Sequence, residues 1–120
     1  MGRVFTVDEA RAMMPGVLER ADDFVRMRGD LAELVRELRD HGESELGGLP
    51  EVKALEARLE EILGWFASNG VEVKGVAPLL VDFPATLGGV SVQLCWLEGD
   101  RDLVWYHRDD LGFAGRRPLP

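Results

Sequence analysis

One run near the C-terminal end of the chain holds most of the side chains that could do chemistry. It reads LCWLEGDRDLVWYHRDDLGFAGRRPL, residues 94–119, and contains the only cysteine, Cys95, and one of the two histidines, His107. Asp109 and Asp110 follow His107 closely, and carboxylates at such a distance can orient an imidazole or join it as metal ligands. His107, Asp109 and Asp110 therefore form the predicted metal set, and the ion would be a divalent metal.

A second candidate set combines Asp82 and Arg116 with His107. Asp82 lies within the apolar run PLLVDFPA, and a carboxylate inside a buried strand needs a partner. Arg116, Arg108 and Lys74 are the candidate partners if the role of Asp82 is a structural ion pair. If Asp82, His107 and Arg116 instead converge on one pocket, they would bind a small ligand, with Arg116 clamping an anion.

The pairing of the last two predicted strands decides whether Cys95 can join these residues. Gly99-Asp100 is typical of a two-residue hairpin turn, and such a turn pairs Val92 with His107. Because side chains alternate along a strand, this register places Cys95 and His107 on opposite faces and argues against a shared metal ion. A single bulge would reverse that arrangement. In the predicted register, Cys95 is a small buried hydrophobe.

The elements that must position these side chains form two halves of one predicted domain, residues 1–120. In residues 1–70, Thr6 and Glu9 form a capping box, and apolar residues then recur at helical spacing in two long segments. Residues 71–120 change to a period of two and predict four strands, in the segments VEVK, LLVDF, VSVQLCW and LVWYH. We therefore expect an α+β fold: a long N-terminal helical hairpin packed on a small, mainly antiparallel C-terminal sheet of about four strands.

Composition excludes several classes of function. The 120 residues are 46% hydrophobic and carry a formal net charge of −8. An acidic chain is repelled by nucleic-acid phosphates and by anionic membrane surfaces, so we expect neither as a partner. A lone cysteine cannot form an intramolecular disulfide, and the first residues contain no apolar run of the signal-peptide kind. These features predict a cytoplasmic protein.

The length of the predicted helices indicates self-association. A helix of about 24 residues is about 36 Å long, which exceeds the width of a domain of this size. The helical hairpin must therefore project from the domain or pack against a second copy, and we expect a homodimer. With no complete catalytic motif in the sequence, the leading hypothesis is a non-enzymatic protein-interaction or structural module. The alternative is a metal- or small-ligand-binding protein, with hydrolase activity included, that uses the His/Asp/Arg cluster.

Several short motifs also resemble a known family when they are taken together and in order. They are FTVDEARAMMP, GVEVKG, LVDFPA, LCW, WYH and GFAGRRPL. This combination resembles the uncharacterised prokaryotic family called domain of unknown function 2203, over nearly the whole chain. The resemblance implies a small bacterial cytoplasmic protein and implies that Asp82, Cys95, His107 and Arg116 fall within recurring motifs. It brings no activity and no catalytic residues with it.

Overall fold

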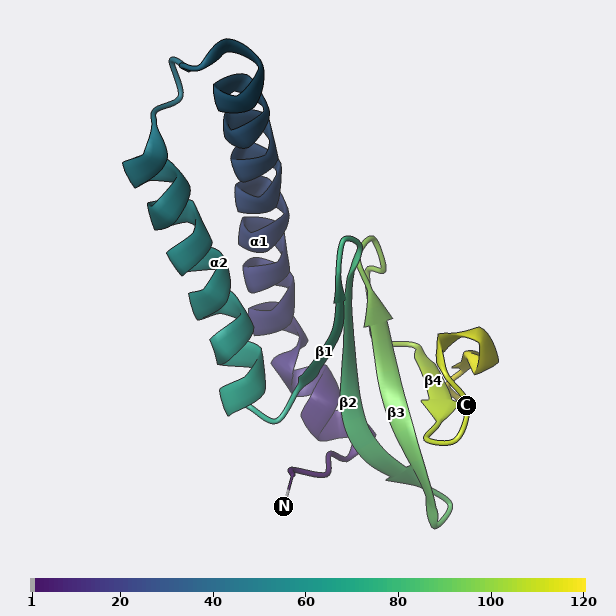
Figure 1. Cartoon of the computed structure of the whole chain (residues 1–120). Coiled ribbons are helices and arrows are strands. Elements are labelled where there is room, and N and C mark those ends of the chain that lie inside the picture. Colours follow the sequence, from purple (N-terminus) through teal and green to yellow (C-terminus); the bar gives the residue numbers. More distant parts are fainter. Residues whose placement is uncertain (1) are drawn as a thin grey trace.

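The computed structural model describes residues 2–120, so Met1, the first residue of the predicted domain, lies outside the described residues. Two helices pack side by side and are followed by one antiparallel sheet, which confirms the predicted α+β fold (Figure 1). The sheet has five strands in the order β1-β2-β3-β4-β5. The elements are α1 (Val7–His41), α2 (Leu49–Ser68), β1 (Glu72–Val76), β2 (Leu79–Leu87), β3 (Val90–Leu97), β4 (Trp105–Arg108), the short 3₁₀ helix η1 (Phe113–Gly115) and β5 (Arg117–Pro118).

Helix α1 begins at the predicted capping box. The Thr6 hydroxyl accepts a hydrogen bond from the Glu9 N–H at 3.0 Å, and the Thr6 N–H donates to the Glu9 carboxylate at 2.8 Å. The helix runs through Pro15 and ends at Gly42, which takes a left-handed conformation with φ 76°. Its 35 residues make it longer than predicted, and the molecule extends 56 × 25 × 24 Å. The far end of the helical hairpin therefore projects well beyond the sheet (Figure 1).

The core lies between the helices and one face of the sheet. Alternate residues of β2 and β3 supply that face, and it packs against α1 and the end of α2, which contributes Phe66. Phe5 adds an edge-to-face contact with Phe83, with ring centroids 5.3 Å apart. Within the described residues, neither helix is long and apolar enough to cross a bilayer.

The predicted pairing of β3 with β4 is wrong by one residue. The chain turns at Gly99, but residues 101–104 continue irregularly before β4 begins at Trp105. Leu103 is buried in the core, and its carbonyl accepts a hydrogen bond from Arg11, so these contacts hold the longer connection in place. Gln93 consequently pairs with His107, where Val92 was predicted. A shift of one residue exchanges the two faces of a strand.

An ion pair joins α1 to the turns at the end of the sheet. Both terminal nitrogens of Arg28 donate to the Glu98 carboxylate, at 2.8 and 2.9 Å, and one of them also donates to the Val76 carbonyl at 2.6 Å. The Leu79 N–H donates to the same carboxylate at 2.8 Å. The hydrogen bonds from Arg28 and then from Leu79 lower the pKa of Glu98 to about 2.

Removal of Arg28 tests this connection. We expect Arg28→Met to lower the free energy of unfolding at neutral pH by roughly 1–3 kcal/mol, because it takes the charged donors away from Glu98. The matched control is Arg26→Met, which breaks an exposed pair with Asp23 and should cost roughly 0–1 kcal/mol.

The loss should also depend on pH. Because the pKa of Glu98 is depressed in the fold, its stabilisation is present above the ordinary value of 4.5 and is lost as the pH falls toward 2. Urea unfolding at neutral and at acidic pH measures both effects. Equal losses for the two arginine variants at neutral pH would contradict the assignment.

Candidate functional site

Three adjacent strands place a carboxylate, a thiol and an imidazole on the face of the sheet that points away from the helices. They are Asp82 on β2, Cys95 on β3 and His107 on β4, with exposed fractions of 3%, 0% and 7%. Asp82 and Cys95 are cross-strand partners. One possible ligand atom from each residue lies within 4.8 Å of the other two. The prediction that Cys95 and His107 lie on opposite faces is therefore wrong, because the β3–β4 register differs by one residue.

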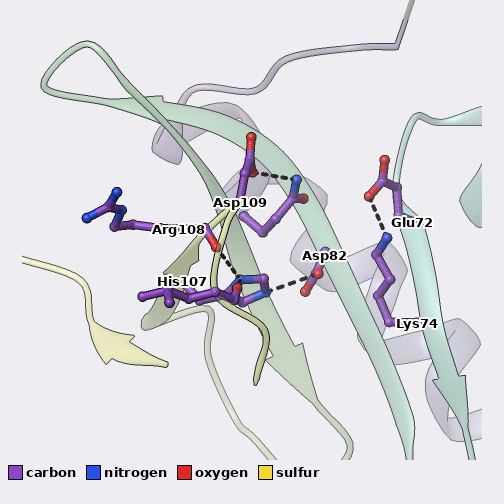
Figure 2. Close-up of polar contacts among 8 residues, drawn as sticks. Glu72, Lys74, Asp82, His107, Arg108 and Asp109 are labelled. Atoms are coloured by element: carbon purple, nitrogen blue, oxygen red, sulfur yellow. Dashed lines mark hydrogen bonds and ion pairs between the residues drawn. The ribbon is translucent and has the colours of Figure 1, made fainter. Parts of the chain in front are cut away.

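The hydrogen bonds of His107 determine where its ring proton lies. Nδ1 is 2.7 Å from the Leu111 carbonyl oxygen and 3.0 Å from the Arg108 carbonyl oxygen. Carbonyl oxygens only accept, so Nδ1 carries a proton. Nε2 points the other way and lies 3.2 Å from Asp82 Oδ2 (Figure 2). Nδ1 therefore cannot act as a general base. Nε2 is the ring nitrogen that can interact with Asp82 or with a metal ion.

Burial sets the ionisation of the other two groups. It raises the pKa of Asp82, and the charge and hydrogen bond of His107, the charge of Lys74 and a hydrogen bond from Cys95 only partly oppose that shift. Burial and then the negative charge of Asp82 raise the pKa of Cys95 to about 12. A thiol with such a pKa is protonated at neutral pH and is a poor nucleophile. A metal cation would reverse this, because a coordinating thiol is deprotonated.

A cavity of about 390 Å³ opens directly onto Asp82 and His107. Gln93, Asp109 and Lys74 also line it. Gln93 Nε2 donates to Asp109 Oδ1 at 2.9 Å. Asp82 Oδ1 and Gln93 Oε1 are both buried and have no hydrogen-bond partner within residues 2–120. Two residues that line the cavity therefore each hold a buried acceptor without a donor or a cation.

The family assignment rests on one comparison. A family model described as an uncharacterized conserved protein, DUF2203, matches residues 3–119. The chain belongs to the DUF2203 family. The motif resemblance is thus confirmed, although the family description names no activity. Comparisons with the curated proteins and with the solved structures gave no match.

The DUF2203 chain brings together some of the predicted site residues. Asp82 and His107 meet, and Asp109 and Asp110 line the same cavity. Neither Asp109 nor Asp110 belongs to the group of possible ligand atoms that lie within 4.8 Å of one another around His107. Asp109 instead accepts a hydrogen bond from Gln93, and Asp110 pairs with Arg108 at 3.0 Å. The structure instead supplies Asp82 and Cys95 as the neighbours of His107.

Arg116 lies apart from the cavity of this DUF2203 chain. Its guanidinium pairs with Asp100 and lies 4.6 Å from the centre of the Trp105 ring and 5.1 Å from that of Phe113. It therefore connects the C-terminal tail to the β3–β4 connection. The hydrogen-bond partner of Asp82 is His107, and neither Arg116 nor Arg108 takes that role.

Lys74, the third predicted partner of Asp82, pairs with Glu72 at 3.1 Å (Figure 2). The sequence interpretation argued against Cys95 as a ligand unless a bulge intervened, and it did not identify Gln93 as a cavity residue. The predicted register placed both residues on the face opposite His107, so their positions in the sequence did not indicate a shared site.

Asp82→Asn tests whether the buried charge stabilises the fold. In metal-free protein at about pH 8, we expect the Asn variant to be at least as stable as the native chain, because an uncharged amide replaces the buried carboxylate. Asp82→Ala should lose about 1–3 kcal/mol, because Nε2 is left without a partner.

The pH dependence has a defined sign. Since the pKa of Asp82 is raised in the fold, its contribution is fully present below the ordinary value of 3.8 and is lost as the pH rises through the folded value. The advantage of Asp82→Asn over the native chain should therefore grow with pH. Chemical denaturation of the native chain, Asp82→Asn and Asp82→Ala, from about pH 4 to about pH 8, measures the difference in the free energy of unfolding. A loss in the Asn variant as large as that in the Ala variant would mean that the charged pair dominates.

Proposed function

We propose that the chain binds a divalent transition metal through Asp82, Cys95 and His107. The observation that carries the proposal is the meeting of these three buried side chains, each from a different strand, with ligand atoms within 4.8 Å of one another. Carboxylate oxygen, thiolate sulfur and imidazole nitrogen are the ligand types that zinc uses, at about 2.0–2.3 Å. Zinc is accordingly the ion that suits this set best.

The surroundings of His107 support the same proposal. A metal-ligating histidine usually donates its second ring N–H to a carbonyl or a carboxylate, which fixes the ring. In this chain Nδ1 is already committed to the Leu111 and Arg108 carbonyls, and Nε2 faces the other two ligands. A cation would also offset the buried charge of Asp82, which lacks a partner at Oδ1.

Metal-assisted hydrolysis is the reaction class that fits the proposal. Three protein ligands with an open fourth position are typical of catalytic zinc sites, whereas structural zinc sites use four. The cavity beside Asp82 and His107 offers space for that fourth position. Asp109 and Asp110 would act at its rim, and Arg116 would hold the tail that carries η1 beside it. A reducing bacterial cytoplasm, the proposed location, would keep Cys95 available as a ligand.

Metal content provides the test. We expect tag-free protein that is loaded with zinc and desalted to retain a stoichiometric amount, as measured by elemental mass spectrometry. His107→Ala should lose the metal, because it removes the imidazole ligand. The control is His41→Ala, which changes the exposed second histidine at the end of α1 and should retain the metal.

Cobalt substitution then tests the thiol separately. The thiolate-to-cobalt absorption band should be present in the native chain and absent in Cys95→Ser. Equal metal content in the two histidine variants, or a cobalt complex without the thiolate band in the native chain, would overturn the proposed ligand set.

A second proposal is self-association through the helical hairpin, as a homodimeric interaction module. Its support is the poor burial of the projecting end. Beyond Phe24, Leu34 is the one fully buried residue of α1 in the described chain, while Val35, Leu46 and Leu49 are 42%, 49% and 65% exposed. The charges on the two helices are mixed in sign with an excess of acids, so basic side chains of one copy can face acidic side chains of the other. Two hairpins would complete a four-helix bundle.

Light scattering tests the dimer. We expect a dimer at micromolar concentration in the native chain and a monomer in the double variant Val35→Glu and Leu49→Glu, because the two carboxylates would enter the interface. Val90→Glu, at an exposed position in the β2–β3 turn region, is the matched control and should stay dimeric. A native monomer would overturn self-association and direct the search to a different protein partner.

A further inference from the structure

The cavity beside Asp82 and His107 has an excess of hydrogen-bond acceptors. Gln93 and Asp82 line it, and Gln93 Oε1 and Asp82 Oδ1 are buried without a hydrogen-bond partner in the described chain. A buried acceptor left unpaired is costly, so native proteins seldom keep two in one place without a use for them. A ligand that donates hydrogen bonds would satisfy both.

The orientation of the Gln93 amide follows from its neighbour. The oxygen and the nitrogen of a side-chain amide have the same shape, so the hydrogen-bond partners decide which end is which. The Asp109 carboxylate, 2.9 Å away, can only accept, so the atom that faces it is the Nε2 donor. Oε1 is therefore the acceptor that remains for a ligand. Asp109 also lines the cavity.

The charges around the cavity favour a cation over an anion. Three carboxylates line it, from Asp82, Asp109 and Asp110, against the ammonium of Lys74. Lys74 pairs with Glu72, Asp110 pairs with Arg108 and Asp82 faces His107. An anionic ligand would meet more carboxylates than cations in this lining, whereas a cationic ligand would be attracted.

The remaining wall of the cavity is apolar. Leu80, Leu111 and Phe113 contribute it. A ligand that fits both parts has a compact positive group with several N–H donors and a short hydrocarbon body. A primary ammonium carries three donors and no acceptor, which matches an excess of acceptors.

We propose that this cavity binds a small primary alkylammonium compound. Its ammonium group donates to Asp82 Oδ1, Gln93 Oε1 and the Asp109 carboxylate, and its alkyl chain lies against Leu80, Leu111 and Phe113. Asp82 faces His107 through Oδ2, so a metal held on that side leaves Oδ1 for the ammonium. The inference goes beyond metal binding and does not require it.

An isosteric series of probes tests the inference. Butylammonium, butanol and butyrate have the same short chain and differ in charge and donors. We expect calorimetry with chelator-treated protein to give an affinity for butylammonium at least about tenfold above those for butanol and butyrate, a difference of about 1.4 kcal/mol. Equal affinities for the three probes, or a preference for butyrate, would overturn the proposal.

Two variants locate the site. Asp109→Asn removes a rim charge and should weaken butylammonium binding about tenfold, and Gln93→Leu should weaken it by a similar factor because the Oε1 acceptor is lost. The control Asp102→Asn changes an exposed acid in the β3–β4 connection, which lies outside this cavity, and should bind like the native chain. Circular dichroism confirms that each variant is folded. Identical affinities for Asp109→Asn and Asp102→Asn would overturn the assignment.

The metal and ammonium proposals fail separately. Selective butylammonium binding by chelator-treated protein supports the ammonium site even if His107→Ala and His41→Ala hold equal metal. Stoichiometric zinc with no selectivity among the three probes would leave the metal site in place and remove the ammonium site.

Discussion

Burial of one carboxylate is the constraint on which the C-terminal half of the molecule depends. Asp82 is 3% exposed in the middle of the sheet, where an ionised group needs a neighbour of opposite charge or a donor. His107 serves as that neighbour only because β4 pairs with β3 in a register that turns the imidazole toward β2. The carbonyls of Arg108 and Leu111 then fix the ring. Strand register, the segment after β4 and the candidate site therefore form one unit.

The parts of the fold that could be predicted are those that local sequence specifies. Thr6 and Glu9 mark the start of α1 because both partners of the capping box lie within four residues. The change of apolar period near Gly70 likewise separates helices from strands, because the period can be read from short stretches of sequence. The β3–β4 connection could not be predicted from Gly99-Asp100, because its length depends on the burial of Leu103 and on a hydrogen bond from Arg11 in α1. Such tertiary contacts leave no local pattern.

The candidate site could be predicted in part. Asp82 could be recognised as a polar residue in an apolar run, and His107 as a titratable residue at the end of a strand. Arg116 could not be assigned a partner, since Asp100 and Asp82 are both carboxylates and only the position of the tail selects between them. The predicted register excluded Cys95 from the site, because it placed Cys95 on the face opposite His107. An error of one residue in a turn thus changed the chemistry expected of the sheet.

The way the sheet ends has a consequence for what can attach to it. β2 extends past its pairing with β1, but the segment before α1 covers that stretch: the Phe5 N–H donates to the Pro84 carbonyl at 2.7 Å and Phe5 bridges to Ala85. The opposite border is β5, only two residues long and containing Pro118. Short, covered or proline-bearing borders give a foreign strand little to pair with. A chain shortened before Thr6 would lose this cover, and β2 would become a template for aggregation.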